Sequence, residues 1–306
     1  MKARAGASNP WTCRKVLCFA HQGGAHDAPA STVMAMHRAV LSGAHALELD
    51  VHATSDGVIV CSHDPVVDTT TDGTGAIASM TYAEVGLLDA AWWFVPGRGA
   101  VTGLPDSSYP LRGARRSEPG LALASLRQVL EQFPSTLLNL DIKQTSPVVE
   151  PYEALVAEEL ARAGRTEGVI VGSFSEQALT AFHEVAPHVD LAATPAAVAR
   201  LLQSLLELGD GGNPSDESSG TGCVPSADNL PYVALQVPAS MAGVEIVTPQ
   251  LMAASERLEV AVHVWTVNDM AEAGRLVRLG VHGVMSDAPA AVSAYLRDRG
   301  ASWAAG

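Results

Sequence analysis

Positive charge is scarce in this 306-residue chain, which has 19 Lys and Arg residues against 33 Asp and Glu. The net charge is -14 at pH 7, the sequence pI is near 5.0, and no long Lys/Arg run occurs. A nucleic-acid partner and electrostatic docking on an anionic membrane are therefore not expected. A small anionic substrate needs a local metal ion or a specific cation to offset this negative field.

Long apolar runs and paired cysteine motifs are also missing. No stretch of about 18 apolar residues occurs, so no stable membrane insertion is expected. The N-terminus lacks the long apolar segment of a secretory signal, which makes a cytoplasmic enzyme the default expectation. The four cysteines show no Cys-x-x-Cys spacing, and Cys18 and Cys61 lie in apolar strand-like runs, which predicts buried free thiols. The oligomeric state stays open.

Apolar strand-like and helix-like runs alternate along most of the chain. Strands are predicted at residues 16–20, 47–51, 58–62, 137–142, 168–171, 189–192, 232–236, 244–247, 260–265 and 283–285. Helices of 10 to 15 residues between strands indicate right-handed βαβ units and a parallel sheet. About eight such units predict an α/β fold, a (β/α)₈ TIM barrel, in a single domain over residues 16–298. Residues 64–120 are too long for a plain connection and predict a small insertion over the barrel mouth, after the second strand region.

A pair of carboxylates is the strongest chemical signal. Glu48 and Asp50 alternate with Leu47, Leu49 and Val51, so a strand places both acids on one face. At about 4 Å two such charges repel by roughly 1 to 4 kcal/mol, and burial adds a desolvation cost. A bound divalent cation is the usual resolution. With His21 before this strand and His63 after it, the set predicts a metal-assisted hydrolase.

A further polar strand follows at residues 138–143. Asn139, Asp141 and Lys143 are spaced two apart and therefore share one face of that strand. An isolated Asp-x-Lys pair is more often a structural ion pair. Its significance here comes from the other three motifs.

Together these motifs resemble the glycerophosphodiester phosphodiesterase family. The family pattern runs His-Arg-Gly, Glu-Asn-Thr, Glu-x-Asp, Thr-x-Asp-Gly, His-Asp and Glu-x-Lys, and the matching segments here are residues 21–23, 30–32, 48–50, 54–57, 63–64 and 141–143. Residues 171–174, 263–268 and 280–289 are similar to later family landmarks. The resemblance spans about residues 16–297, and it rests on the order of the motifs rather than on any one of them.

The resemblance implies a barrel enzyme that cleaves glycerophosphodiesters, small-molecule substrates, to glycerol 3-phosphate and an alcohol. It implies Ca²⁺ or Mg²⁺ on three oxygen ligands, Glu48, Asp50 and Asp141. It makes His21 and His63 an acid/base pair. Lys143, Gln22 and Trp265 are the implied substrate contacts, although Trp265 packing inside the barrel is an equal alternative. Water and a substrate hydroxyl both remain possible nucleophiles.

Four positions depart from the family pattern. Gln22 replaces an arginine and so removes a guanidinium that can bind phosphate through two hydrogen bonds. Ala30 and Ser31 replace Glu-Asn, and Asp141 is one methylene shorter than the usual Glu, so that a metal there needs a shifted position or a bridging water. Arg112, Arg115 and Arg116 of the insertion are candidate replacements for the missing cation.

Other functions follow from the same residues. A lysophospholipid substrate follows if the aromatic segment 91–94 carries the acyl chain, although the insertion's own core is the favoured interpretation of that segment. The changes at Gln22 and Ala30 also allow a barrel that binds phosphodiesters without turnover. An amidohydrolase-type barrel is disfavoured, because its His-x-His motif would need a histidine at Gly23. Asn268 is expected to cap the helix that starts near Asp269.

Overall fold

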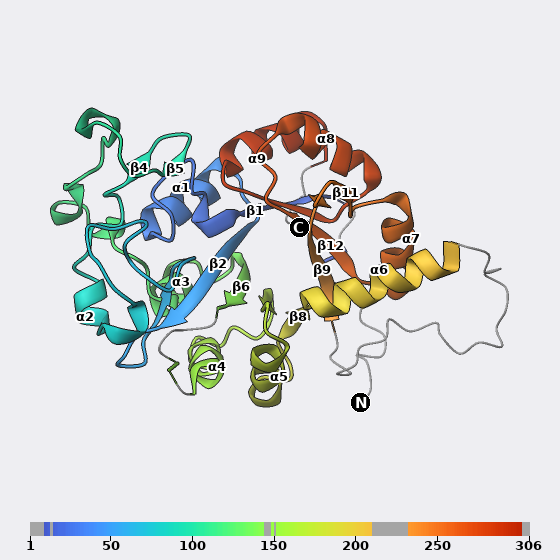
Figure 1. The fold of residues 1–306 in the computed structure, drawn as a ribbon, viewed down its shortest axis with the longest axis horizontal. Helices are drawn as coiled ribbons and strands as arrows, with labels where there is room; N and C mark the ends of the chain where they lie inside the picture. The colour runs from blue at the N-terminus through green and yellow to red at the C-terminus, as the bar shows by residue number, and fades with distance from the viewer. Residues whose placement is uncertain (1–8, 13–14, 144–147, 150, 210–231, 302–306) are drawn as a thin grey trace.

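The centre of the molecule is a closed barrel of parallel strands (Figure 1). The computed structural model describes residues 9–12, 15–143, 148–149, 151–209 and 232–301. Its barrel strands, in the order in which they pair, are β1 (Leu17–Ala20), β2 (Ala46–Ala53), β6 (Leu137–Ile142), β7 (Val169–Gly172), β8 (Asp190–Ala192), β9 (Tyr232–Pro238), β12 (Ala261–Trp265) and β13 (Gly283–Ser286). β13 pairs back with β1, which closes the ring and confirms the predicted (β/α)₈ fold.

Helices surround this ring and cover the outward face of the strands (Figure 1). They are α1 (Val33–Ser42), α3 (Leu126–Gln132), α4 (Tyr152–Arg162), α5 (Glu176–Val185), α6 (Pro195–Gly209), α7 (Pro249–Leu258), α8 (Met270–Leu279) and α9 (Pro289–Asp298). Several begin at a residue whose side chain accepts a hydrogen bond from the first turn, as Thr32, Ser125 and Thr248 do. Leu47, Leu49 and other outward strand residues pack against the helices in one continuous apolar layer, so the alternate residues are left to fill the barrel interior.

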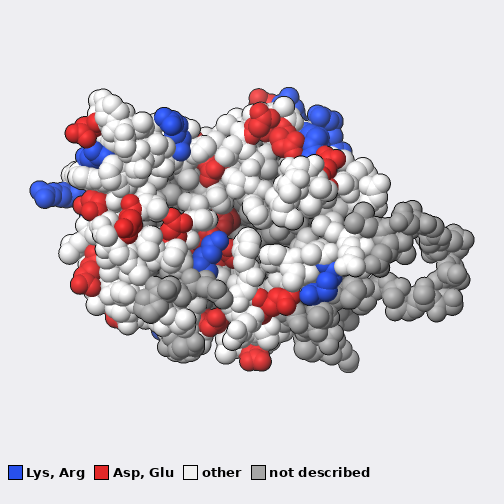
Figure 2. Space-filling view, viewed as in Figure 1, with Lys and Arg blue, Asp and Glu red and all other residues white. Residues whose placement is uncertain are grey.

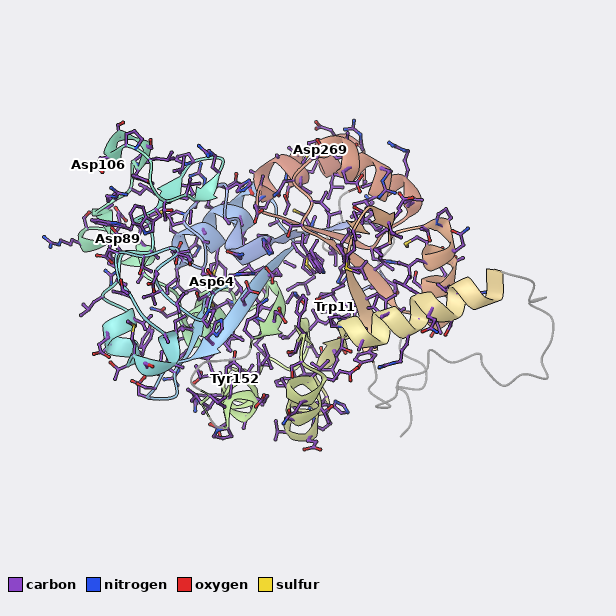
Figure 3. The ribbon with its side chains drawn as sticks, in the orientation of Figure 1. Trp11, Asp64, Asp89, Asp106, Tyr152 and Asp269 are labelled. Atoms are coloured by element: carbon purple, nitrogen blue, oxygen red, sulfur yellow. The ribbon has the colours of Figure 1, made fainter. Side chains whose placement is uncertain are left out.

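The amino-terminal segment closes one end of the barrel. Trp11 is 1% exposed and packs in the interior cluster with Phe19, its ring stacked at a centroid distance of 6.4 Å. The indole Nε1 donates to the carboxylate of Asp190 at 2.8 Å, and the Asn9 amide donates to the Val233 carbonyl at 2.7 Å. Asp190 and Val233 lie at the amino ends of their strands, so Trp11 (labelled in Figure 3) seals the end opposite the strand carboxyl ends.

The segment between β2 and α3 forms a separate lobe beside the barrel (Figure 1). β3 (Ile59–Cys61) runs antiparallel to β2, and α2 (Tyr82–Val85), β4 (Phe94–Val95) and β5 (Gly99–Ala100) follow. Short 3₁₀ turns lie at Ile77–Ser79, Asp106–Ser108, Ala114–Arg116 and Pro119–Leu121, with another after β1 at His21–Gly23. The lobe has its own apolar cluster around Val60, Val67, Ile77, Val85 and Leu123.

The prediction that residues 244–247 form a strand of the barrel is wrong. The chain there forms a small antiparallel hairpin of β10 (Ser240–Met241) and β11 (Val244–Glu245) outside the barrel. Ala242 and Gly243 both have positive φ, 51° and 80°, which is the backbone of a two-residue hairpin turn. This reversal leaves too few residues for a barrel strand.

The cysteine prediction is confirmed where it can be observed: Cys18 and Cys61 are buried free thiols, and Cys13 and Cys223 lie outside the described residues. In the described part of the chain, no helix is both long and apolar enough to cross a membrane.

The buried tryptophan at the closed end gives a stability prediction. Trp11→Ala removes a fully packed ring and leaves the Asp190 carboxylate without its indole donor, so we expect a loss of about 3 to 5 kcal/mol in the free energy of unfolding. Urea denaturation measures it. Leu41→Ala is the control, because that side chain is 87% exposed and its removal should cost less than about 0.5 kcal/mol. If Trp11→Ala lowers the free energy of unfolding no more than Leu41→Ala does, the role of Trp11 in stabilising the closed end of the barrel is contradicted.

Candidate active site

The predicted site residues meet at the carboxyl ends of the strands. A cavity of about 330 Å³ lies there, which we call the catalytic cavity. Figure 2 shows a hollow near the middle of this face, with acidic atoms inside it and basic atoms at its edge. The lining includes seven of the eight predicted residues: His21, Glu48, Asp50, His63, Asp141, Lys143 and Trp265. Gln22 lines a neighbouring cavity instead.

Strand register brings the acids together. β2 and β6 pair in parallel so that Glu48 lies opposite Asn139 and Asp50 opposite Asp141. Glu48 is 4% exposed and Asp50 is 2% exposed. Burial and the adjacent Asp50 carboxylate raise the pKa of Glu48 to about 8, so this pair is held at an energetic cost.

Lys143 is the cation nearest these acids in the described residues. Its Nζ lies 2.9 Å from Asp50 Oδ1 and 2.6 Å from Asp141 Oδ2. Burial alone would lower the pKa of Lys143, but the two carboxylates outweigh it and raise that pKa. Burial raises the pKa of Asp141, and Lys143 partly offsets the shift. Lys143 therefore bridges two strands as a buried double ion pair.

Carboxylates are the type of ligand that suits a hard divalent cation, but the arrangement of these acids suits one only in part. Asp50 Oδ2 is buried without a hydrogen-bond partner in the described structure, which leaves one oxygen free for a ligand. Glu48 Oε2 accepts the backbone N–H of Gln22 at 3.0 Å. Across the described ranges, however, no three His, Cys, Asp or Glu side chains are grouped closely enough to hold a metal ion. Asp141 is turned toward Lys143, so it reaches an ion beside Glu48 and Asp50 only through a shift or a water.

His21 is paired with a carboxylate that we did not predict from the sequence. Its Nδ1 lies 2.6 Å from Asp287 Oδ1, and its Nε2 lies 3.9 Å from Glu48 Oε2. Asn268 donates from Nδ2 to Asp287 Oδ2 at 2.7 Å. Burial alone would lower the pKa of His21, but Glu48 and Asp287 outweigh it and raise that pKa to about 9. His21 is therefore an imidazolium at neutral pH in this arrangement.

His63 is more open and has a local partner. Its side chain is 53% exposed, and its Nδ1 hydrogen-bonds Asp64 Oδ1 at 2.8 Å. Asp64 (labelled in Figure 3) lies between β2 and the lobe. His52 donates from Nε2 to the His63 carbonyl at 3.3 Å. This contact fixes the backbone that carries His63.

The expectation for Asn268 is wrong. The cap of α8 is Asp269, whose carboxylate accepts the N–H of Glu272 at 2.8 Å. Asn268 instead accepts the N–H of Asp287 at 2.9 Å and orients that carboxylate toward His21. The signal for Asp287 was its place in the Ser286-Asp287-Ala-Pro motif, at the end of the last strand.

The far half of the catalytic cavity is apolar. Side chains of α6, β9 and the β10–β11 hairpin line it, including Leu202, Val237, Met241 and Ile246. Phe174 and Met241 are 64% and 63% exposed, and the Phe174 ring lies 6.2 Å from that of Trp265. These side chains form an apolar wall in the same cavity as the charged cluster, and Lys143 Nζ lies 5.2 Å from the centre of the Phe174 ring.

The aromatic segment of the lobe does not contribute to this wall. The guanidinium of Arg112 lies 4.8 Å from the ring centres of both Trp92 and Trp93, and it pairs with Asp106 (labelled in Figure 3) at 2.7 Å. Arg115 donates to the Gly86 carbonyl at 2.5 Å. None of these residues, nor Arg116, lines either cavity. The acyl-platform hypothesis and the three candidate replacement arginines are therefore not supported.

Comparisons with known proteins agree with this geometry. A model of the glycerophosphoryl diester phosphodiesterase family matches residues 21–291. A glycerophosphodiester phosphodiesterase of Bacillus altitudinis is 26% identical over 89% of this chain and 94% of its own length. One from Bacillus subtilis is 26% identical over 90% of this chain and 84% of its own. An Oleispira antarctica phosphodiesterase, solved in complex with the product sn-glycerol-3-phosphate, superimposes with a TM-score of 0.67 at 22% identity, over 92% of this chain and 97% of that one.

The His21 cluster gives a pH prediction. The folded-state pKa of His21, about 9, lies above its ordinary 6.5, so its stabilisation is complete below pH 6.5 and is lost as the pH rises to 9. Glu48 acts in the same direction, because the folded chain keeps a proton that the unfolded chain releases. In protein free of divalent metal, we expect the free energy of unfolding to fall by on the order of 1 to 3 kcal/mol between pH 6.5 and 9.

Urea titrations at the two pH values measure this fall. Asp287→Asn lowers the pKa of His21 and should reduce the fall, whereas Asp298→Asn, at an exposed position, should leave it unchanged. Equal pH dependence in the wild type and Asp287→Asn contradicts the assignment.

Proposed function

The chain belongs to the glycerophosphoryl diester phosphodiesterase family, and from this premise we propose that it hydrolyses glycerophosphodiesters to glycerol 3-phosphate and an alcohol. One observation carries the proposal: two histidines, each oriented by its own aspartate, line the same cavity as a buried carboxylate pair. That arrangement supplies proton transfer on both sides of a phosphorus atom. The product bound to the Oleispira antarctica enzyme supports the same substrate class.

Glu48 and Asp50 are the proposed holders of a divalent cation, Ca²⁺ or Mg²⁺, with Asp141 completing the set directly or through water. The unpartnered Asp50 Oδ2 and the raised pKa of Glu48 support this assignment. When bound, such an ion supplies Lewis-acid stabilisation of a phosphodiester oxygen. It also offsets the repulsion between the two acids.

The two histidines differ in a way that suggests their roles. His21 carries a proton that Asp287 and Glu48 stabilise, so it can protonate the departing alcohol oxygen. His63 is more exposed and is oriented through Nδ1 by Asp64, so its Nε2 can accept a proton from the nucleophile. Lys143 directs a positive charge into the same cavity and can contact the phosphate. Water and a substrate hydroxyl remain alternative nucleophiles.

Activity measurements test this mechanism. Purified protein is assayed on glycerophosphocholine and glycerophosphoethanolamine with Ca²⁺, with Mg²⁺ and with EDTA. His21→Ala and His63→Ala should each lower kcat/KM by roughly 100-fold or more, and EDTA should abolish turnover. His37→Ala is the matched control, since that ring bonds Gln132 on the outside of the barrel. Turnover without a metal ion contradicts the mechanism. If none of the diesters is hydrolysed, the result favours a protein that binds phosphodiesters without turnover.

A lysophospholipid is the second candidate substrate, favoured by the apolar half of the catalytic cavity. The phosphodiester would lie at the acids while the acyl chain covers Phe174, Leu202 and Met241. Removing such a chain from water is favourable by about 0.8 kcal/mol per methylene.

Polar substitutions on this apolar wall should distinguish the two candidate substrates. Leu202→Ser and Met241→Ser should each lower kcat/KM for a lysophosphatidylcholine by about tenfold. Their effect on glycerophosphocholine should stay within about twofold. Leu87→Ser, at a 78% exposed site in the lobe, controls for a general effect of removing surface apolarity. Equal losses on both substrates argue against an acyl-binding wall.

A further inference from the structure

A second cavity, of about 260 Å³, lies beside the catalytic cavity and shares His63 with it. We call it the polar cavity. Three segments distant in sequence contribute to it: the turn after β1 with Gln22 and His26, the loop after β3 with Asp64 and Thr70, and the β4–β5 hairpin with Arg98. It therefore exists only where the lobe meets the barrel.

Backbone contacts fix the hairpin that carries Arg98. The N–H of Gly97 donates to the carbonyl of His26 at 2.8 Å. Gly99 has a φ of 76°, and a Cβ there would lie 3.4 Å from the carbonyl oxygen of Ala25. This close approach seats the hairpin directly on the turn after β1, so the Arg98 backbone is positioned although its side chain is exposed.

The polar cavity has hydrogen-bond donors that are available to a ligand. Its two carboxylates are already engaged, Asp64 with His63 and Asp287 with His21. Within the described chain, no carboxylate lies within ion-pair distance of Arg98, which lines this cavity. A guanidinium with N–H donors free for a ligand in one small cavity suits a ligand that carries anionic oxygen atoms.

We propose that the polar cavity binds the glycerophosphate half of the substrate and that Arg98 is a specificity-determining residue there. This rests on the proposed function, and it assigns the two ends of the diester to two cavities. The phosphate lies near the shared His63, the glycerol hydroxyls lie within the polar cavity, and the departing alcohol lies in the apolar half of the catalytic cavity. Arg98 and Gln22 line the same cavity, so Arg98 supplies from the lobe the cation that Gln22 cannot.

Titration calorimetry with sn-glycerol 3-phosphate tests the assignment without requiring turnover. Arg98→Ala should weaken binding by at least about tenfold, and Arg98→Lys, which keeps the charge but not the planar fork, should give an intermediate loss. Arg116→Ala is the matched control, because it removes the same charge from an exposed site of the lobe that lines neither cavity.

The outcomes separate this proposal from the proposed function. An Arg98→Ala protein that binds as tightly as Arg116→Ala, or a wild type that does not bind glycerol 3-phosphate, overturns the subsite. A wild type that binds it in an Arg98-dependent manner but hydrolyses no diester supports the subsite and contradicts the hydrolase. A raised KM on glycerophosphocholine in Arg98→Ala, with kcat little changed, supports both.

Discussion

The structure depends on burying three carboxylates side by side at one end of a barrel. Glu48 and Asp50 share a face of β2, and the register of β2 on β6 places Asp141 directly opposite Asp50. A slip of one residue would turn the acids of either strand toward the helices, where the apolar layer cannot accept them. The strand register, the closure of the barrel and the position of Lys143 therefore together determine how these charges are balanced. Lys143 provides one cation for two of these acids, whereas burial and the Asp50 carboxylate keep the pKa of Glu48 raised.

Chemistry and substrate selection come from different parts of the fold. The residues assigned to carry charge or move protons lie on β2 and β6 and just after β1, β3 and β6. The surfaces proposed to contact the rest of the substrate lie elsewhere: on the barrel helix α6 and the β10–β11 hairpin on the apolar side, and on the lobe on the polar side. Such surfaces can change without disturbing the register of the acids. This division explains how the acid pair and both histidines can be present while Gln22 departs from the family pattern.

Local patterns in the sequence predicted the parts of the site that neighbours in sequence determine. Alternation alone placed Glu48 and Asp50 on one face, and βα spacing predicted the barrel. Contacts between distant segments were not predictable. Asp287 reaches His21 across 266 positions, and only closure of the barrel by β13 on β1 brings them together. Arg98 depends on how a hairpin seats on the turn after β1. Arg112 was misjudged because the sequence does not show that Trp92 and Trp93 occupy its guanidinium.

The charge balance of the site connects these observations. Glu48, Asp50 and Asp141 carry three potential negative charges against one from Lys143, in a chain whose net charge is -14. The imidazolium of His21 is matched by Asp287, so it adds little net charge. An anionic phosphodiester is therefore repelled unless further cations are present. A divalent ion on Glu48 and Asp50 would remove most of that repulsion from one side. Arg98 lines the polar cavity on the other side of the shared His63, and among the described residues that line that cavity it is the one lysine or arginine. The arginine missing at Gln22 matters less for an enzyme whose lobe brings one to the same cavity.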